Sequence, residues 1–308
     1  MRVGVDIGGT KTEAVLLASD GTVAGLLRIP TGFGGEAVVA TAVEAVSRVV
    51  ISAGVDPSRV TSVGVGIPGA VDSERGRVSH ALNLGVDALE LGDLLSGELA
   101  VPVRVENDVN AAALGAFHVL ELSSDDSMGY LNLGTGLAAG LVLRGELWRG
   151  SRGAAGEIGH ILVDPSGPRD LDGQAGGLEV VASGSGIARQ WATGEDNAVS
   201  AVLAAADAGD ERAIEIRRRL FEGVATSVRI LVLTVDVDSV VIGGGVSRLG
   251  DRLLGGVDEI FRSWAAQSPF IESLELSSRV RLLPESAPVA ALGAAYLGAR
   301  PLAARVGS

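Results

Sequence analysis

The chain has 308 residues, more than one ordinary hydrophobic core holds, so two domains are expected. Hydrophobic residues make up 47% of it and the formal net charge is −13. This composition excludes a disordered chain and argues against nucleic acid or an anionic membrane as the main partner. Cysteine is absent, which excludes disulfides and thiolate-bound metals.

Targeting and membrane-spanning segments are not expected. Asp6 places a carboxylate where a signal peptide needs an unbroken apolar stretch. Uncharged runs such as 127–143 are interrupted by Gly, Asn and Thr and fall short of a membrane span. The sequence therefore predicts a cytoplasmic protein.

Strand and helix patterns alternate along the first part of the chain. Two apolar runs, 3–7 and 14–18, flank a glycine turn and predict a hairpin. The next predicted elements are a helix over 36–53, a strand over 60–67, a strand over 101–105 and an Ala-rich helix to about residue 120. This alternation predicts an α/β fold with ligands at the carboxyl ends of the strands.

The pattern restarts after residue 129. Runs 130–133 and 138–143 again flank a glycine turn, and Val5-Asp6-Ile7-Gly8 matches Leu131-Asn132-Leu133-Gly134 in type. Beyond an irregular loop over 164–177, we expect helices near 179–193, 196–208 and 210–234, a strand over 239–242 and a closing helix over 288–299. A duplicated hairpin predicts two related lobes that face one cleft, although a glycine-rich chain also produces such similarity by chance.

Three glycine turns follow predicted strands and are candidate phosphate sites, because their N–H groups are unobstructed by side chains. They contain Gly8, Gly9 and Thr10; Gly134, Thr135 and Gly136; and Gly243, Gly244 and Gly245. The first also contains Lys11, the single lysine of the chain, whose ammonium could neutralise a transferring phosphate. The alternatives are tight structural hairpins and an exposed turn lysine.

Two polar clusters are candidates for the remaining chemistry. Asp108 follows a strand and opens a helix, where a carboxylate could accept a proton from an attacking alcohol, or could simply cap the helix. Glu157 and His160 form an i,i+3 pair in a glycine-rich stretch, or a capped turn with a surface histidine.

These motifs, in this order, resemble the ROK (repressor, open reading frame, kinase) sugar kinases of the actin/hexokinase superfamily over nearly the whole chain. The matching segments are Val5–Lys11, Gly66–Gly69, Asn83–Gly85, Glu106–Ala111, Leu133–Gly136, Gly156–His160, Leu178–Gly184 and Val241–Ser247. The resemblance implies two ribonuclease H-like lobes with a ligand cleft between them, formed by residues 1–116 with 287–308 and by residues 117–286. It also implies a homodimer.

The resemblance further implies an ATP-dependent hexose kinase of the glucokinase type, which phosphorylates a sugar hydroxyl, expected at C6. Asp108 would be the base and Asp6 would hold Mg²⁺ through water. The sugar contacts would be Gly69, Asn83, Asn107, Asp108, Glu157, His160 and Glu179. The ATP contacts would be Gly8, Gly9, Thr10, Lys11, Gly134, Thr135, Gly136, Gly244 and Gly245.

The chain departs from the family pattern at the zinc site. Asp170, Asp172 and Gly177 stand where the family has three zinc cysteines, and His160 occupies the position of the fourth ligand. No zinc is therefore expected, although two carboxylates and an imidazole could in principle hold a metal. Val86 also replaces a tryptophan that often follows Asn83-Leu84-Gly85.

Three alternatives to a glucokinase stay open. The first is an N-acetylhexosamine kinase for N-acetylglucosamine or N-acetylmannosamine, because epimers and acetylated sugars are read by the same kinds of polar residue. The second is a sugar-binding sensor without turnover, which the lost zinc site would allow. The third is a nucleotide-binding structural protein of the actin superfamily, in which Asn83 and the Glu157–His160 segment would have no role.

Overall fold

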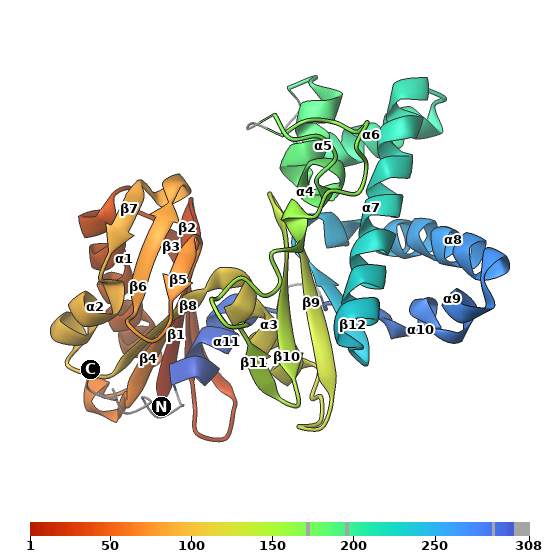
Figure 1. Ribbon diagram of the computed structural model, residues 1–308. Helices are drawn as coiled ribbons and strands as arrows, with labels where there is room; N and C mark the ends of the chain where they lie inside the picture. The colour runs from red at the N-terminus through yellow and green to blue at the C-terminus, as the bar shows by residue number, and fades with distance from the viewer. Residues whose placement is uncertain (171–172, 195–196, 285–286, 299–308) are drawn as a thin grey trace. The chain divides into compact units, whose positions relative to one another are not determined.

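The computed structural model describes residues 1–170, 173–194, 197–284 and 287–298 and divides the chain into two compact units (Figure 1). Of these residues, unit 1 contains 1–122, 149–153 and 287–298. Unit 2 contains 123–148 and 154–284. The chain therefore enters unit 1 three times.

Unit 1 contains a five-stranded sheet with the order β3-β2-β1-β4-β8. β1 is antiparallel to β2 and parallel to β4, and β4 is parallel to β8. The strands are β1 (Arg2–Ile7), β2 (Lys11–Leu17), β3 (Val23–Pro30), β4 (Ser62–Ile67) and β8 (Val103–Asn107). A three-stranded antiparallel sheet joins β5 (Ala70–Asp72), β6 (Arg77–Ala81) and β7 (Val86–Leu89).

The two faces of this sheet bury different helices. Val3, Val5 and Ile7 of β1 share a core with α1 (Gly35–Ser52) and α2 (Leu91–Leu99). Because side chains alternate along a strand, Gly4 faces the other way. A Cβ placed there would lie 1.8 Å from a carbonyl oxygen of α11 (Val289–Gly298), so α11 packs directly on the strand backbone. α3 (Asp108–Val119) packs against α11 on that side.

Unit 2 repeats the topology with the strand order β11-β10-β9-β12-β13. β9 is antiparallel to β10 and parallel to β12, as β1 is to β2 and β4. The strands are β9 (Ser127–Leu133), β10 (Leu137–Leu143), β11 (Glu146–Trp148), β12 (Ser239–Gly243) and β13 (Val280–Leu282). The helices are α4 (Leu178–Ala182), α5 (Gly184–Trp191), α6 (Ala198–Asp207), α7 (Glu211–Val235), α8 (Asp251–Gln267), α9 (Pro269–Ser273) and α10 (Leu276–Arg279). The hairpin repeat predicted from the sequence is a repeat of whole sheet topologies.

The predicted helix over 179–193 is wrong as a single helix, because α4 ends and α5 begins at Ser183. The Ser183 hydroxyl accepts a hydrogen bond from the Gly186 N–H and caps α5. The Gly184 N–H donates to the Gly134 carbonyl at 2.9 Å instead of continuing the helix. A tertiary hydrogen bond to the second glycine turn therefore breaks a pattern that is helical in the sequence.

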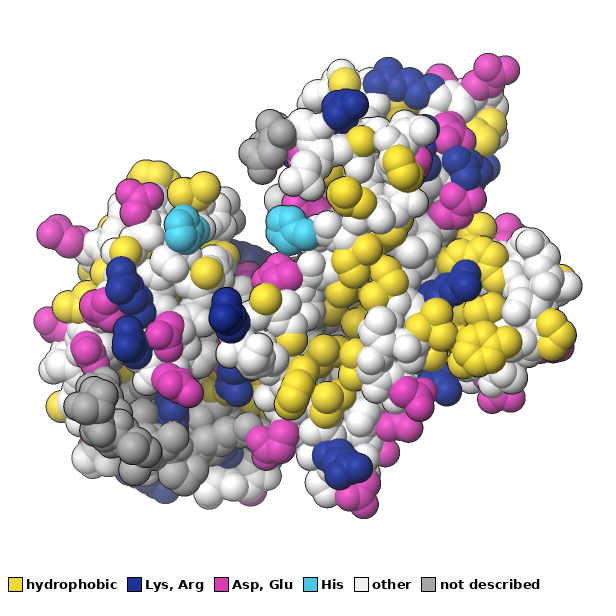
Figure 2. All heavy atoms as spheres, in the orientation of Figure 1, with side chains coloured by type: hydrophobic (Ala, Val, Ile, Leu, Met, Phe, Trp, Pro, Cys, Tyr) yellow, Lys and Arg dark blue, Asp and Glu magenta, His cyan; other side chains and the backbone are white. Residues whose placement is uncertain are grey.

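Surface charge agrees with the composition. Figure 2 shows acidic and basic side chains interspersed over the face that it presents, without a broad basic area. Within the described ranges, no helix combines the length and the apolar character that crossing a membrane requires.

Candidate functional site

In unit 1, parallel pairing brings the predicted catalytic residues to one edge of the sheet. Asp6 of β1 is in register with Gly66 of β4, which is in register with Glu106 of β8. A Cβ on Gly66 would lie 3.8 Å from Asp6 Oδ1 and 3.6 Å from the Cα of Asp108. The backbone of Gly66 thus separates Asp6 from the start of α3, and a larger residue there would intrude between them.

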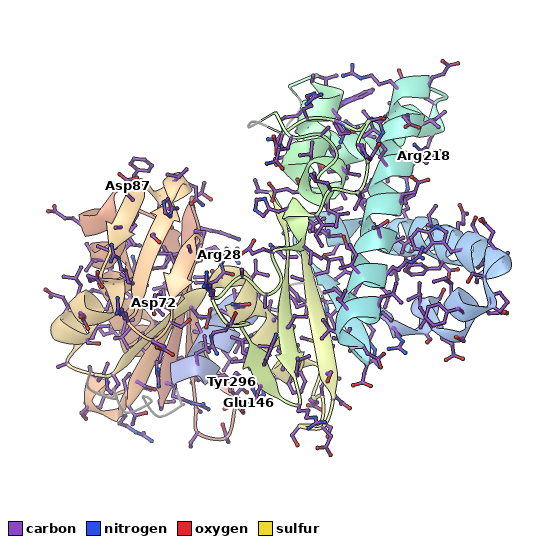
Figure 3. The ribbon with its side chains drawn as sticks, viewed as in Figure 1. Arg28, Asp72, Asp87, Glu146, Arg218 and Tyr296 are labelled. Atoms are coloured by element: carbon purple, nitrogen blue, oxygen red, sulfur yellow. The ribbon has the colours of Figure 1, made fainter. Side chains whose placement is uncertain are left out.

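The carboxyl of Asp6 has a pKa well above its ordinary value. Burial raises the pKa of its carboxyl to about 7, and the nearby carboxylates of Asp108 and Glu13 add to the rise, while Lys11 opposes it. Glu13 lies opposite Asp6 on β2 and forms an ion pair of 2.6 Å with Arg28 of β3, which Figure 3 labels. The two neighbouring carboxylates therefore disfavour the ionised form of Asp6, in the same direction as its burial.

The first glycine turn lies beside the predicted sugar asparagine. The Gly8 N–H donates to the Lys11 carbonyl at 2.9 Å, and Gly9, Thr10 and Lys11 are exposed. A Cβ on Gly9 would lie 3.2 Å from Asn83 Nδ2. The structure therefore brings a candidate phosphate site and a candidate sugar contact together, although Gly9 and Asn83 are 74 positions apart in the chain.

Asn107, rather than Asp108, caps α3. Its Oδ1 accepts hydrogen bonds from the N–H groups of Val109 and Asn110, and its Nδ2 donates to the Gly69 carbonyl at 3.2 Å. Capping therefore accounts for Asn107, and the alternative that Asp108 serves as the cap is wrong. Asp108 is the first residue of α3, and its Oδ1 accepts from the Val109 N–H at 3.0 Å.

In unit 2, Glu179 supports the second glycine turn. Its Oε2 accepts a hydrogen bond of 3.0 Å from the Leu137 N–H, and a Cβ on Gly136 would lie 2.6 Å from the same oxygen. Gly244 has φ of +85° and would place a Cβ 2.8 Å from the Gly134 nitrogen. The second and third glycine turns are therefore neighbours, and Gly244 requires glycine because of its positive φ and its close backbone contacts.

The Glu157–His160 segment lies against the same turn. Ile158–His160 forms a single 3-10 turn, and the Glu157 side chain makes no capping hydrogen bond. A Cβ on Gly159 would lie 2.2 Å from the Leu137 carbonyl oxygen and 3.3 Å from Glu179 Cβ. His160 is exposed. Four segments that the sequence singled out in this half of the chain thus converge within one unit: 134–136, 157–160, Glu179 and 244–245.

The loop that replaces the zinc site is closed by local hydrogen bonds. The Gln174 N–H donates to Asp170 Oδ1 at 2.7 Å, and the Asp170 N–H donates to the Gln174 carbonyl at 2.9 Å. Asp172 lies outside the described residues. Among the residues that are described, no group of three or more His, Asp or Glu side chains could hold a metal ion. The zinc-free state stays a prediction.

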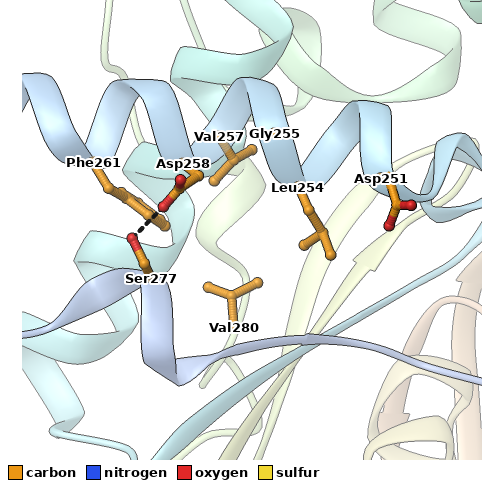
Figure 4. A pocket seen from close by; sticks show the side chains of 8 residues that line it. All are labelled: Asp251, Leu254, Gly255, Val257, Asp258, Phe261, Ser277 and Val280. Carbon is orange, nitrogen blue, oxygen red and sulfur yellow. Dashed lines mark hydrogen bonds between the residues drawn. The ribbon is translucent and has the colours of Figure 1, made fainter.

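A pocket of ≈ 340 Å³ lies elsewhere in unit 2, between α8 and the segment that ends in β13 (Figure 4). It is lined by Asp251, Leu254, Gly255, Val257, Asp258, Phe261, Ser277 and Val280. None of these residues belongs to the predicted site, and Ser277 donates a hydrogen bond of 2.5 Å to Asp258 across it.

A family model described as the ROK family matches residues 2–300 of this chain. The chain belongs to the ROK family. A glucokinase from Halalkalibacterium halodurans is 33% identical over 282 residues, which are 85% of this chain and 86% of that protein. An N-acetylmannosamine kinase from Escherichia coli is 32% identical over 275 residues, which are 86% of this chain and 88% of that protein.

The fold agrees with this assignment. The crystal structure of a ROK family glucokinase from Streptomyces griseus in complex with glucose and AMPPNP is similar to this chain, with a TM-score of 0.75 and 31% identity. The match covers 96% of this chain and 98% of that one. Together with the repeated sheet topology, it confirms the predicted α/β class of two actin/hexokinase-like units.

Two residues, Glu106 and Arg149, were missed as site candidates. Glu106 entered the sequence analysis only as the first residue of the matching segment Glu106–Ala111, yet it is 2% exposed and accepts four hydrogen bonds. One of them comes from Arg149, which nothing in the sequence distinguishes from the other arginines. The available signal for Glu106 was a carboxylate at the end of a strand, directly before Asn107 and Asp108.

Proposed function

We propose that this chain is an ATP-dependent hexose kinase of the glucokinase type, with Asp108 as the catalytic base. The observation that carries the proposal is the meeting of Asp6, Gly66 and Asp108 at one edge of the unit 1 sheet. Gly9 and Asn83 are also neighbours in that unit. The kinase relatives described above support the same reaction class.

In the proposed reaction, Asp108 accepts the proton of the sugar hydroxyl, expected at C6, as that oxygen attacks the γ-phosphorus of ATP. The bond from the γ-phosphorus to the bridging oxygen breaks, and ADP leaves. A base positioned at the carboxyl end of a strand contributes about 10²–10⁴-fold to such a step. Asp108 is suited to this task because Asn107 performs the capping of α3.

The glycine turns fit phosphate. Gly8, Gly9, Thr10 and Lys11 in unit 1, and Gly134, Thr135, Gly136, Gly244 and Gly245 in unit 2, are the proposed ATP contacts. Gly244 has a positive φ, and the backbone of the second turn fills the space that a side chain there would need. Mg²⁺ accompanying ATP would be held through water near Asp6 and would neutralise phosphate charge.

The sugar contacts proposed are Gly69, Asn83, Asn107, Glu157, His160 and Glu179. The proposed lobes are residues 1–116 with 287–308 and residues 117–286. We also propose a cytoplasmic homodimer, on the resemblance alone. Size-exclusion chromatography with light scattering tests the oligomer.

An N-acetylhexosamine kinase is the second candidate function. The similarity to the N-acetylmannosamine kinase from Escherichia coli nearly equals that to the Halalkalibacterium halodurans glucokinase. Discrimination between these sugars depends on a few buried polar contacts.

A coupled ADP-release assay separates these functions. The purified protein is incubated with ATP, Mg²⁺ and, in turn, glucose, mannose, fructose, N-acetylglucosamine and N-acetylmannosamine. The proposal requires sugar-dependent ADP release with glucose, while release with an acetylated sugar alone establishes the second candidate. Calorimetric binding of a sugar without ADP release would instead identify a sensor.

A further inference from the structure

Glu106 is a buried carboxylate one residue before Asn107. It is 2% exposed, and an isolated charge at such a position is strongly unfavourable. Its Oε1 accepts from the Asn107 N–H at 3.0 Å and from Asn110 Nδ2 at 3.1 Å. Its Oε2 accepts from the Ser73 hydroxyl at 3.1 Å.

Arg149 provides the compensating positive charge. Its Nε lies 2.6 Å from Glu106 Oε2, and the exposed fractions of the two side chains are 33% and 3%. The contact is charge-assisted and largely shielded from water, unlike the pairs between exposed side chains elsewhere on the described surface. Glu106 thus collects hydrogen bonds from four different residues with both of its oxygens.

Arg149 belongs to a short segment of unit 1 that is inserted between two segments of unit 2. β11 ends at Trp148, which belongs to unit 2, and Ala154 returns to unit 2, so 149–153 is a five-residue excursion into unit 1. Glu157 of the family signature follows only four residues after the segment. The Arg149 pair is a polar contact that fixes this excursion to β8, the strand that leads into the catalytic segment.

The hydrogen bonds continue from Glu106 to the proposed base. Glu106 fixes the backbone of Asn107 and the side chain of Asn110. Asn107 in turn caps α3 and donates to the Gly69 carbonyl. Asp108 lies in the chain between Asn107 and Asn110. A change in its backbone dihedral angles would therefore break at least one of these hydrogen bonds.

We propose that the Arg149–Glu106 ion pair positions the first turn of α3, so that Arg149, which lies outside the catalytic segment, helps to hold Asp108 in its reactive orientation. Arg149 and Glu106 are positioning residues and touch no substrate. The inference rests on the proposed function, because it assigns the pair to the turnover of that same site.

The experiment compares Arg149→Met, Arg149→Lys, Glu106→Gln and the double variant Arg149→Met/Glu106→Gln in the full chain. Arg217→Met is the matched control. Arg217 is 31% exposed, close to the value for Arg149, but its partner Asp207 is 53% exposed. Each variant is first checked for fold by circular dichroism, and then kcat and KM are measured for glucose and ATP.

We expect Arg149→Met to lower kcat at least tenfold while the KM for ATP changes less than threefold, since the hydrogen bonds of Glu106 hold the Asn107–Asp108 segment and involve none of the proposed ATP contacts. Arg149→Lys should keep at least a third of the kcat. The double variant should recover part of the loss, because it removes the unpaired buried charge. The control should stay within twofold of the wild type. An Arg149→Met kcat within twofold of the wild type overturns the proposal, as does a double variant no better than Arg149→Met.

Hydrogen exchange gives a readout that does not need activity. The amides of Asn107 and Asn110 donate to Glu106 and Asn107, respectively, so their exchange should accelerate in Arg149→Met and not in Arg217→Met. Unchanged exchange at both amides overturns the proposal even if the wild type phosphorylates none of the sugars. Inactivity of the wild type would overturn only the proposed function. Should Arg149→Met fail to fold, Glu106→Gln and Arg149→Lys carry the same comparison.

Discussion

Replacing Asp6 by asparagine should stabilise the protein at alkaline pH. Burial and the neighbouring carboxylates raise the pKa of Asp6 from 3.8 to about 7. Between these values the folded state retains a proton that the unfolded state has lost, so the free energy of unfolding falls as pH rises through that window. The stability associated with the neutral carboxyl is fully present below pH 3.8 and lost above about 7.

The magnitude follows from the same values. One pKa unit is worth about 1.4 kcal/mol, so a rise from 3.8 to about 7 corresponds to a cost of up to about 4 kcal/mol at pH 8. Asparagine has nearly the same shape and carries no charge. Asp6→Asn should therefore gain up to about 4 kcal/mol relative to the wild type at pH 8, and much less at pH 4.5.

Urea unfolding at pH 4.5 and pH 8, without ATP or divalent cations, measures this difference. Asp87→Asn is the control, because Asp87 is exposed on β7 (Figure 3). Comparing wild type and variant at each pH cancels the titration of all other groups. A stability difference that is the same at both pH values, or that favours the wild type at pH 8, would refute the reasoning. Added Mg²⁺ and ATP should narrow the gap, since a cation near Asp6 favours its ionised form.

Four further predictions concern the catalytic base, ATP binding, helix packing and zinc. Asp108→Asn should lower kcat by about 10²–10⁴-fold with sugar and ATP binding retained, and a variant that keeps more than about a tenth of the wild-type kcat would remove Asp108 as base. Lys11→Ala should raise the KM for ATP or lower kcat with unchanged sugar affinity; unaltered ATP kinetics would make it an exposed turn residue. Gly115→Ala should destabilise the fold by about 1–3 kcal/mol or more in thermal melts, because its Cβ would lie 1.8 Å from the Val289 carbonyl oxygen. Elemental analysis should find no stoichiometric zinc, and zinc whose removal lowers the melting temperature would contradict this.

Much of the fold is local and was therefore accessible from the sequence. The helical spacing of Val38, Ala42, Val46 and Val49 forms the buried stripe of α1, and glycine after an apolar run marks the ends of β1, β9 and β12. The hairpin repeat could be recognised because a hairpin is contiguous in the chain. Two similar strand–turn–strand patterns therefore form the same kind of antiparallel pair, β1 with β2 and β9 with β10. The order of the motifs was sufficient to place the chain in its family.

Weak or short patterns were missed. The strands of the three-stranded sheet, β5 to β7, have three to five residues each, too few for a periodic pattern to stand out. The break at Ser183 could not be predicted, because the Gly184 N–H donates its hydrogen bond to the carbonyl of Gly134, which is 50 residues away in the chain.

The sequence by itself determined the family, the α/β class and the residue types of the candidate site, because these depend on periodicity and on motifs that are contiguous in the chain. Only the tertiary structure decided which of two adjacent residues caps α3, because asparagine and aspartate are both favoured at the N-cap of a helix. It alone also decided that Glu179 supports a glycine turn and that Glu106 is paired with Arg149. Hydrogen bonds and ion pairs depend on distances of a few ångströms between residues that lie tens of positions apart, and no local pattern specifies such distances.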